Sequence, residues 1–184
     1  AEFGVDLSVR AVFDSPTPCG LATGLDALVA MPQSGRRPEL ARRVRPEWLP
    51  LSYSQLAMWF QHRMEGPSDA FNMALALEFD GALDTVALTE ALNDVVVRHE
   101  ALRTTIGVDD GGPAQVIAPE LELTLDVVDL CAFSDGERET AAQRCARNEA
   151  QTTFDLERGP LIRVRLLRLR ENEHWFLLTM HHMI

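Results

Sequence analysis

The chain has 184 residues, of which 46% are hydrophobic and 24% charged, a composition typical of globular rather than disordered proteins. Its formal net charge of −11 argues against a nucleic-acid partner, because the phosphate backbone attracts clustered positive charge. No apolar run approaches the roughly 20 residues that cross a bilayer, and the amino end lacks the basic and hydrophobic regions of a signal peptide. We therefore expect a cytoplasmic protein without a membrane partner.

Residues 1–30 are predicted to belong to a small helical domain. Residues 3–5 read as a helix end, and Thr17 is placed to cap a second helix whose first residue is Pro18. Apolar residues then recur at helical spacing, at Leu21, Leu25, Leu28 and Val29. Thirty residues cannot bury this surface alone, so the segment is interpreted as a remnant of a larger all-α domain.

Residues 31–50 are predicted to form a linker, because prolines and a glycine interrupt any regular structure there. The same stretch is rich in arginine. Two interpretations stay open: a solvated tether, or a segment whose arginines pin it to an acidic domain surface. The arginines are Arg36, Arg37, Arg42, Arg43 and Arg45.

From Leu51 onward the pattern indicates a mixed α/β domain. A helix is expected from Ser52 or Ser54 through Phe60, a strand over residues 71–79, and a long helix capped by Asp84. Residues 102–108 read as extended, and the sequence Asp-Asp-Gly-Gly at 109–112 as a hairpin turn leading to another strand.

The second half of this domain continues the alternation of strands and helices. Residues 123–128 suggest a strand, and Ser134 with Glu137 forms a capping-box pattern that opens a helix to about residue 152. Residues 161–169 and 174–182 read as an antiparallel pair. The expected fold class is α/β (α+β), a mixed sheet with helices packed on one face.

Two adjacent histidines, His181 and His182, end the last of these strands. Neighbouring side chains on a strand point to opposite faces, so one histidine should be buried and the other presented at the strand's carboxyl edge. The same geometry opposes convergence of both rings on one metal ion, and the three cysteines lack zinc-site spacing. We therefore expect no metal site, and histidine chemistry near neutral pH is the better hypothesis.

Four stretches, in order, resemble the motifs of nonribosomal peptide synthetase condensation domains. The RHEALRT stretch matches the second motif of that family without a mismatch, and the last stretch is similar to the start of its third motif, HHxxxDG. Ala57 departs from the first motif, which usually has an arginine at that position. The four stretches are residues 51–60 (LSYSQLAMWF), 98–104 (RHEALRT), 154–161 (FDLERGPL) and 180–184 (MHHMI).

The resemblance implies a domain organisation. Residues 51–184 would be the amino-terminal, chloramphenicol-acetyltransferase-like lobe of a condensation domain, without its carboxy-terminal lobe. Residues 1–30 resemble the second half of a peptidyl carrier domain, joined by the linker at 31–50. The aspartate and glycine of HHxxxDG would fall beyond Ile184, and the carrier's phosphopantetheine-bearing serine would precede Ala1.

The resemblance also implies a reaction and its residues. Condensation domains form an amide bond when the amine of an acceptor aminoacyl thioester attacks the donor thioester, both held on the 4'-phosphopantetheine arms of carrier domains. His182 would face the tunnel as the catalytic residue, as a base or by orienting the amine. His181 would support the site from the interior, and Arg103 would pair with the motif's aspartate. Expected partners are the donor and acceptor carrier domains, the second lobe and an adenylation domain.

Three alternatives remain beside this interpretation. An epimerisation domain of the same superfamily shares the histidine pair, although the match at residues 98–104 argues against it. A degenerate condensation-like domain that recruits partner proteins, and an acyltransferase that uses coenzyme A, are the others. Removing one partner of a buried ion pair typically costs about 3–5 kcal/mol, so we expect this chain alone, lacking the partner of Arg103, to be poorly stable and inactive.

Overall fold

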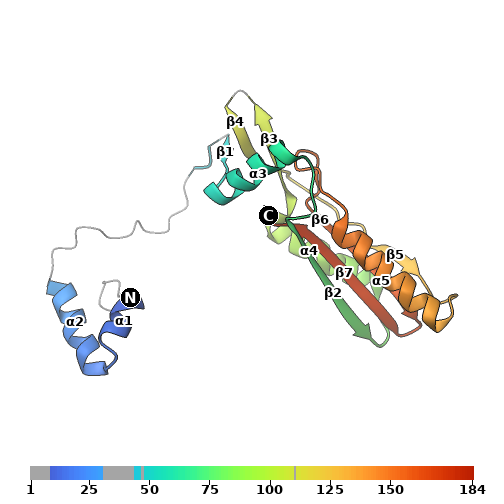
Figure 1. The fold of residues 1–184 in the computed structure, drawn as a ribbon, viewed down its shortest axis with the longest axis horizontal. Helices are drawn as coiled ribbons and strands as arrows, with labels where there is room; N and C mark the ends of the chain where they lie inside the picture. Colours follow the sequence, from blue (N-terminus) through green and yellow to red (C-terminus); the bar gives the residue numbers. More distant parts are fainter. Residues whose placement is uncertain (1–8, 31–43, 47, 110) are drawn as a thin grey trace. The chain divides into compact units, whose positions relative to one another are not determined.

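The computed structural model describes residues 9–30, 44–46, 48–109 and 111–184, and the chain divides into two compact units, Ala1–Val44 and Arg45–Ile184. The first unit holds helices α1 (Val9–Asp14) and α2 (Pro18–Ala30) (Figure 1). Thr17 caps α2 as predicted, since its Oγ1 accepts a hydrogen bond from the Gly20 N–H at 3.2 Å. No residue of α2 is buried, as expected for helices without a core of their own. The helix end predicted at 3–5 lies outside the described residues.

The second unit is built on two sheets, and the larger one is mixed. The smaller sheet has the order β1-β4-β3, with antiparallel neighbours; its strands are β1 (Leu49–Pro50), β3 (Thr104–Asp109) and β4 (Gly112–Ile117). The larger sheet has the order β2-β7-β6-β5, in which β5 is parallel to β6 and the other pairs are antiparallel. Its strands are β2 (Asn72–Asp80), β5 (Asp126–Asp129), β6 (Ile162–Arg170) and β7 (Glu173–His181).

The helices of this unit begin where their capping residues predict. They are α3 (Tyr53–Glu65), α4 (Thr85–Arg98), a 3₁₀ turn η1 (Glu100–Arg103) and α5 (Asp135–Gln151). Asp84 Oδ1 accepts hydrogen bonds from the Val86 and Ala87 N–H groups, in the first turn of α4, at 2.9 and 3.0 Å. The Glu137 carboxylate accepts from the Ser134 N–H at 3.2 Å, the return bond of a capping box.

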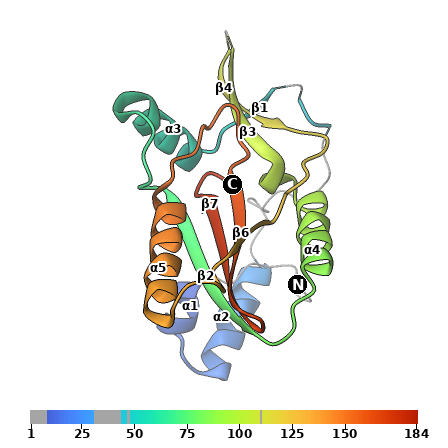
Figure 2. The same ribbon diagram turned by 90° about the vertical axis from the view of Figure 1, so that its right-hand side faces the viewer.

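Helices α4 and α5 lie on opposite faces of the large sheet, so the prediction of a single covered face is wrong (Figure 2). Strand β6 shows why. Leu166 packs in the core that includes α4, whereas its neighbour Leu167 packs against α5, and both are fully buried. A strand covered on both faces carries consecutive apolar residues rather than strict alternation, and this phase change at Leu166–Leu167 was the missed signal.

Two strand boundaries also differ from the sequence-based expectation. The strand predicted at 123–128 begins only at Asp126, because the Asn93 side chain takes the place of a neighbouring strand for Leu123, accepting from its N–H at 2.7 Å and donating to its carbonyl at 3.1 Å. At the other boundary, the predicted linker ends in strand β1. Leu49 and Pro50 pair with Gln115 and Ala114 of β4, an edge position that tolerates proline.

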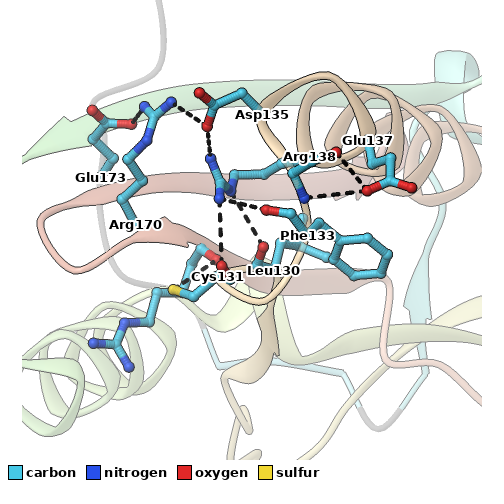
Figure 3. A network of polar contacts seen from close by, with 10 residues as sticks. Leu130, Cys131, Phe133, Asp135, Glu137, Arg138, Arg170 and Glu173 are labelled. Carbon is cyan, nitrogen blue, oxygen red and sulfur yellow. Dashed lines mark hydrogen bonds and ion pairs between the residues drawn. The ribbon is translucent and has the colours of Figure 1, made fainter.

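A polar network ties the start of α5 to the β6–β7 hairpin (Figure 3). The buried Arg138 donates from Nε to the Leu130 carbonyl at 3.3 Å and from Nη2 to the Phe133 carbonyl at 2.6 Å. Asp135 pairs with Arg138 and accepts from Arg170 Nη2 at 3.0 Å. One guanidinium thereby closes the loop between β5 and α5 and connects it to the hairpin.

Candidate active site

The histidine pair lies where β7 ends and a tight turn begins. His181 is the last residue of β7, and its N–H donates to the Leu161 carbonyl at 2.9 Å. The His182 N–H donates to the Phe71 carbonyl at 2.9 Å, and the Ile184 N–H returns to the His181 carbonyl at 3.1 Å. His182 is exposed while Met183 is 3% exposed. The turn therefore presents one imidazole to solvent between two buried residues.

His181 is enclosed in the interior, 2% exposed. Its ring lies 5.9 Å from the Phe71 ring and 6.0 Å, edge-on, from the Phe154 ring. Its Nδ1 accepts from the Met183 N–H at 3.3 Å. Burial first, and then the charges of His62 and His182, lower the pKa of His181 from 6.5 to about 4. At neutral pH His181 is uncharged, with Nδ1 as acceptor.

The interior beneath this turn is a core shared by segments that are distant in sequence. Met183 packs with Ile106 of β3 and with Phe154, Leu156 and Leu161 of the segment that precedes β6. Met58 and Trp59 of α3 cover this core. Residues of the first, third and fourth motif-like stretches thus come together around the histidine turn.

The α3 residue Gln55 reaches the same turn, and the sequence analysis did not single it out. Its Nε2 donates to the Met183 carbonyl at 2.9 Å, and its Oε1 accepts from the Ser52 N–H at 2.8 Å. The second of these bonds belongs to a capping box, whose pattern Ser-x-x-Gln is visible at 52–55. That pattern could have flagged Gln55 as a capping residue, but not its bond to a turn 128 positions away.

Arg103 lies at the end of η1, just before β3, with its side chain 14% exposed. Nη1 donates to the Ala118 carbonyl, Nη2 lies 3.5 Å from Glu100 Oε1, and the buried Nε has no hydrogen-bond partner among the described residues. No hydrogen bond or ion pair joins Arg103 to His181 or His182 within the described part of the chain. Of the three residues that the resemblance named, His181 and His182 share the turn, whereas the polar contacts of Arg103 are made to Ala118 and Glu100.

Glu100 joins Arg103 to the segment that enters the domain. Its other carboxylate oxygen pairs with Arg45, and both partners are exposed. The Arg45 guanidinium holds the pKa of the Glu100 carboxyl below its ordinary value. Pinning of the arginine-rich segment to an acidic surface, the second of the two interpretations, requires contacts of this kind. The last arginine of the segment makes one.

Other features of the described residues lie away from this turn. A cavity of about 290 Å³ lies near the opposite end of β7, lined by Glu78, Asp135, Arg170 and Glu173 among others. The described residues contain no group of three or more His, Cys, Asp or Glu side chains that could hold a metal ion. None of the helices among the described residues is long and apolar enough to cross a membrane.

The second unit matches a known protein family over almost its whole length. Residues 46–184 match the family model described as the condensation domain. The chain belongs to the condensation-domain family. The resemblance read from the four stretches is thereby confirmed, and the match begins one residue after the boundary between the two compact units.

The condensation domain has relatives among peptide synthetases. The whole chain is 37% identical over 182 residues to one of the linear gramicidin synthase proteins of Brevibacillus parabrevis, a match that covers 99% of this chain and 2% of that protein. The chain therefore spans only a small part of the curated relatives that it matches. The matched region includes residues of the first unit.

Solved structures confirm the chloramphenicol-acetyltransferase-like α/β fold of the condensation domain. The starter condensation domain of rhizomide synthetase RzmA superposes with a TM-score of 0.69 at 25% identity, covering 75% of this chain and 33% of that chain. A complex of the X-domain and OxyB from teicoplanin biosynthesis gives a TM-score of 0.65 at 34% identity, covering 79% and 30%. This chain corresponds to about a third of each.

Proposed function

We propose that this chain is part of a nonribosomal peptide synthetase and that its condensation domain forms peptide bonds between carrier-bound thioesters. The observation that carries the proposal is the exposed His182, held on a turn between the buried, uncharged His181 and the buried Met183. A ring fixed in this way can meet a substrate, whereas its neighbour cannot. The condensation-domain family and the synthetase relative support the same reaction.

In the proposed reaction the amine nitrogen of the acceptor attacks the thioester carbonyl carbon of the donor. The C–N bond forms and the C–S bond breaks. The amine loses one proton, and the departing sulfur of the donor takes up one proton to leave as a thiol. His182 accepts that proton or orients the amine. A positioned base contributes roughly 10²–10⁴-fold, and alignment of two tethered reactants contributes more, with effective molarities of about 10⁵ M or above. Positioning of the two reactants can therefore contribute as much as proton transfer or more.

The reactants would reach His182 on the 4'-phosphopantetheine arms of a donor and an acceptor carrier domain, which supply the thioesters. An adenylation domain would load the acceptor, and a second lobe would complete the tunnel around His182. Residues 1–30 would be the end of a preceding carrier domain; the helices α1 and α2, and a relative whose match extends over this region, support that assignment. A cytoplasmic location stays a prediction.

Arg103 would support the site at a distance from the histidines. Its guanidinium is mostly buried, and its Nε is a buried donor that no described residue accepts from. A carboxylate is the acceptor best suited to such a guanidinium. We assign that carboxylate to the aspartate of the third motif, which in the family follows the histidine pair.

The assignment of His182 is tested in the intact synthetase. His182→Ala should lower the single-turnover rate of dipeptide formation between loaded carriers by about 10²–10⁴-fold, the range of a positioned acid–base group. His99→Ala is the matched control, since His99 is an exposed histidine that follows α4. The control should stay within about twofold of wild type. Wild-type rates in the His182 variant would refute the catalytic role.

A second candidate is a condensation-like domain that recruits a partner protein instead of catalysing condensation. The X-domain complex favours it, because that structure shows a domain of this fold bound to OxyB and is 34% identical to this chain. Dipeptide formation by the wild-type module with its own loaded carriers decides between the two functions. A module that loads normally but forms no dipeptide would favour recruitment.

A further inference from the structure

The turn that carries His182 is held mainly by contacts within the sheet and within the turn itself. The N–H groups at positions 181 and 182 bond to Leu161 and Phe71, and the Ile184 N–H closes the turn on itself. The Met183 N–H bonds to the His181 ring. A further hydrogen bond comes from helix α3, and it is made to the carbonyl of Met183, the residue after His182.

The Met183 carbonyl is bound by Gln55 from helix α3. Gln55 Nε2 donates to it at 2.9 Å in a partly buried position. Figure 2 shows α3 and the carboxyl end of β7 at the same end of the large sheet. The contact therefore joins the start of α3 to the residue that follows the proposed catalytic histidine.

The opposite end of the same amide is also engaged. Gln55 Oε1 accepts from the Ser52 N–H at 2.8 Å, and the Gln55 N–H donates to Ser52 Oγ at 3.2 Å, which completes the capping box of α3. A glutamate would serve that cap equally well, because only an acceptor is needed there. The turn needs a donor, and an amide supplies both.

We infer that Gln55 is a positioning residue for His182: its amide holds the Met183 carbonyl and thereby fixes the direction in which the His182 ring leaves the turn. The inference rests on the proposed function of His182. In this role Gln55 does not contact the substrate. Its effect is on alignment, where a misplacement of about 1 Å costs on the order of 10²-fold in rate.

One substitution separates the two bonds of the amide. Gln55→Glu keeps the acceptor that caps α3 but replaces the N–H donor by a second carboxylate oxygen, which repels the Met183 carbonyl. In the intact synthetase the variant should lower kcat by about 10–100-fold. KM for the loaded acceptor carrier should be unchanged, because carrier binding does not involve this bond. Amide hydrogen exchange at residues 182–184 should be faster than in wild type.

Ser52→Ala is the matched control. It removes the side-chain acceptor of the cap and leaves the bond from Gln55 Nε2 to Met183 in place. It should lower the melting temperature slightly and leave kcat within about twofold of wild type. A loss of kcat in Ser52→Ala equal to that in Gln55→Glu would show that Gln55 acts only through helix stability, and would overturn the inference.

The His182→Ala variant separates failure of the inference from failure of the proposed function. If His182→Ala is inactive and Gln55→Glu keeps the wild-type kcat, the inference is wrong and the proposed function stands. If His182→Ala keeps the wild-type rate, both are wrong. A lower kcat in Gln55→Glu, with unchanged KM and faster exchange at the turn, supports both.

Discussion

Two adjacent histidines in this chain occupy opposite environments. His181 is 2% exposed and lies between two aromatic rings, whereas His182 is exposed. Neighbouring side chains on a strand point to opposite sides, and this geometry places one ring in the interior and the other in contact with solvent. The two histidines therefore differ in burial although they are the same residue type.

The buried ring makes stability depend on pH in a defined window. Between pH 6.5 and 4 the unfolded state binds a proton at His181 that the folded state excludes, so the free energy of unfolding falls as the pH is lowered through this range. The total loss from this group is roughly 3 kcal/mol. Urea unfolding of the intact domain between pH 4.5 and 7.5, followed by tryptophan fluorescence, measures it.

His181→Asn isolates this contribution. Asparagine keeps an acceptor near the position of Nδ1 for the Met183 N–H but does not titrate. The lost ring packing adds a constant offset, so the slope of stability against pH is compared rather than its value. The variant should have the shallower slope above pH 5. Equal slopes would contradict an uncharged His181.

The residue-scale predictions from the sequence were uneven for a physical reason. Alternation along β7 was enough to predict that one histidine faces the interior and the other does not, because that depends only on strand geometry. The bond from Gln55 to Met183 was not predictable, because it depends on the approach of two segments that only the tertiary fold brings together. The partners of Arg103 were missed for the same reason.

At the scale of elements, capping residues predicted helix starts well, and sheet faces less well. Asp84 and Ser134 each mark a helix within one residue of its beginning, since a cap is a local interaction. To assign α4 and α5 to opposite faces, one must know which apolar residues of β6 share a face with those of the adjacent strands. A short run such as Leu166–Leu167 does not reveal which helix covers which face.

The loop before α5 depends on one buried guanidinium (Figure 3). Arg138→Met should lower the free energy of unfolding by about 2–4 kcal/mol, because the buried hydrogen bond to the Leu130 carbonyl and the partly buried one to the Phe133 carbonyl lose their charged donor. Chemical denaturation of the intact domain measures the loss.

Arg147→Met provides the control for that substitution. Arg147 is exposed on the same helix, so its replacement should change the free energy of unfolding by no more than about 0.5 kcal/mol. Equal losses in the two variants would mean that helix propensity or net charge, rather than the network around Arg138, sets the stability of α5.

At the scale of the whole molecule, the second unit exposes apolar side chains on several of its elements, including α3 and β2. On α3, Phe60 is 60% exposed and Met64 is 71% exposed, and on β2 Leu75 is 48% exposed. Contiguous exposed apolar surface promotes association. The part that this protein matches makes up only 33% and 30% of the two solved relatives.

The 184-residue chain alone should therefore form no peptide bond and should self-associate. Incubation with loaded donor and acceptor carriers, with dipeptide release followed by mass spectrometry, tests activity, and size-exclusion chromatography tests association. The same assays on the intact condensation domain serve as the reference. Dipeptide formation by the isolated chain at the rate of the intact domain would contradict the expected need for a second lobe.

Strand β1 has a practical consequence for module exchange between synthetases. Leu49 and Pro50 belong by composition to an interdomain tether, yet they hydrogen-bond as the outer strand of the small sheet, and Arg45 is paired with Glu100. A splice between Pro50 and Ser52 would import a foreign strand against β4 and remove the partner of Glu100. A splice before Val44 keeps strand β1 and the pair of Arg45 and Glu100 together with the sheet that they contact.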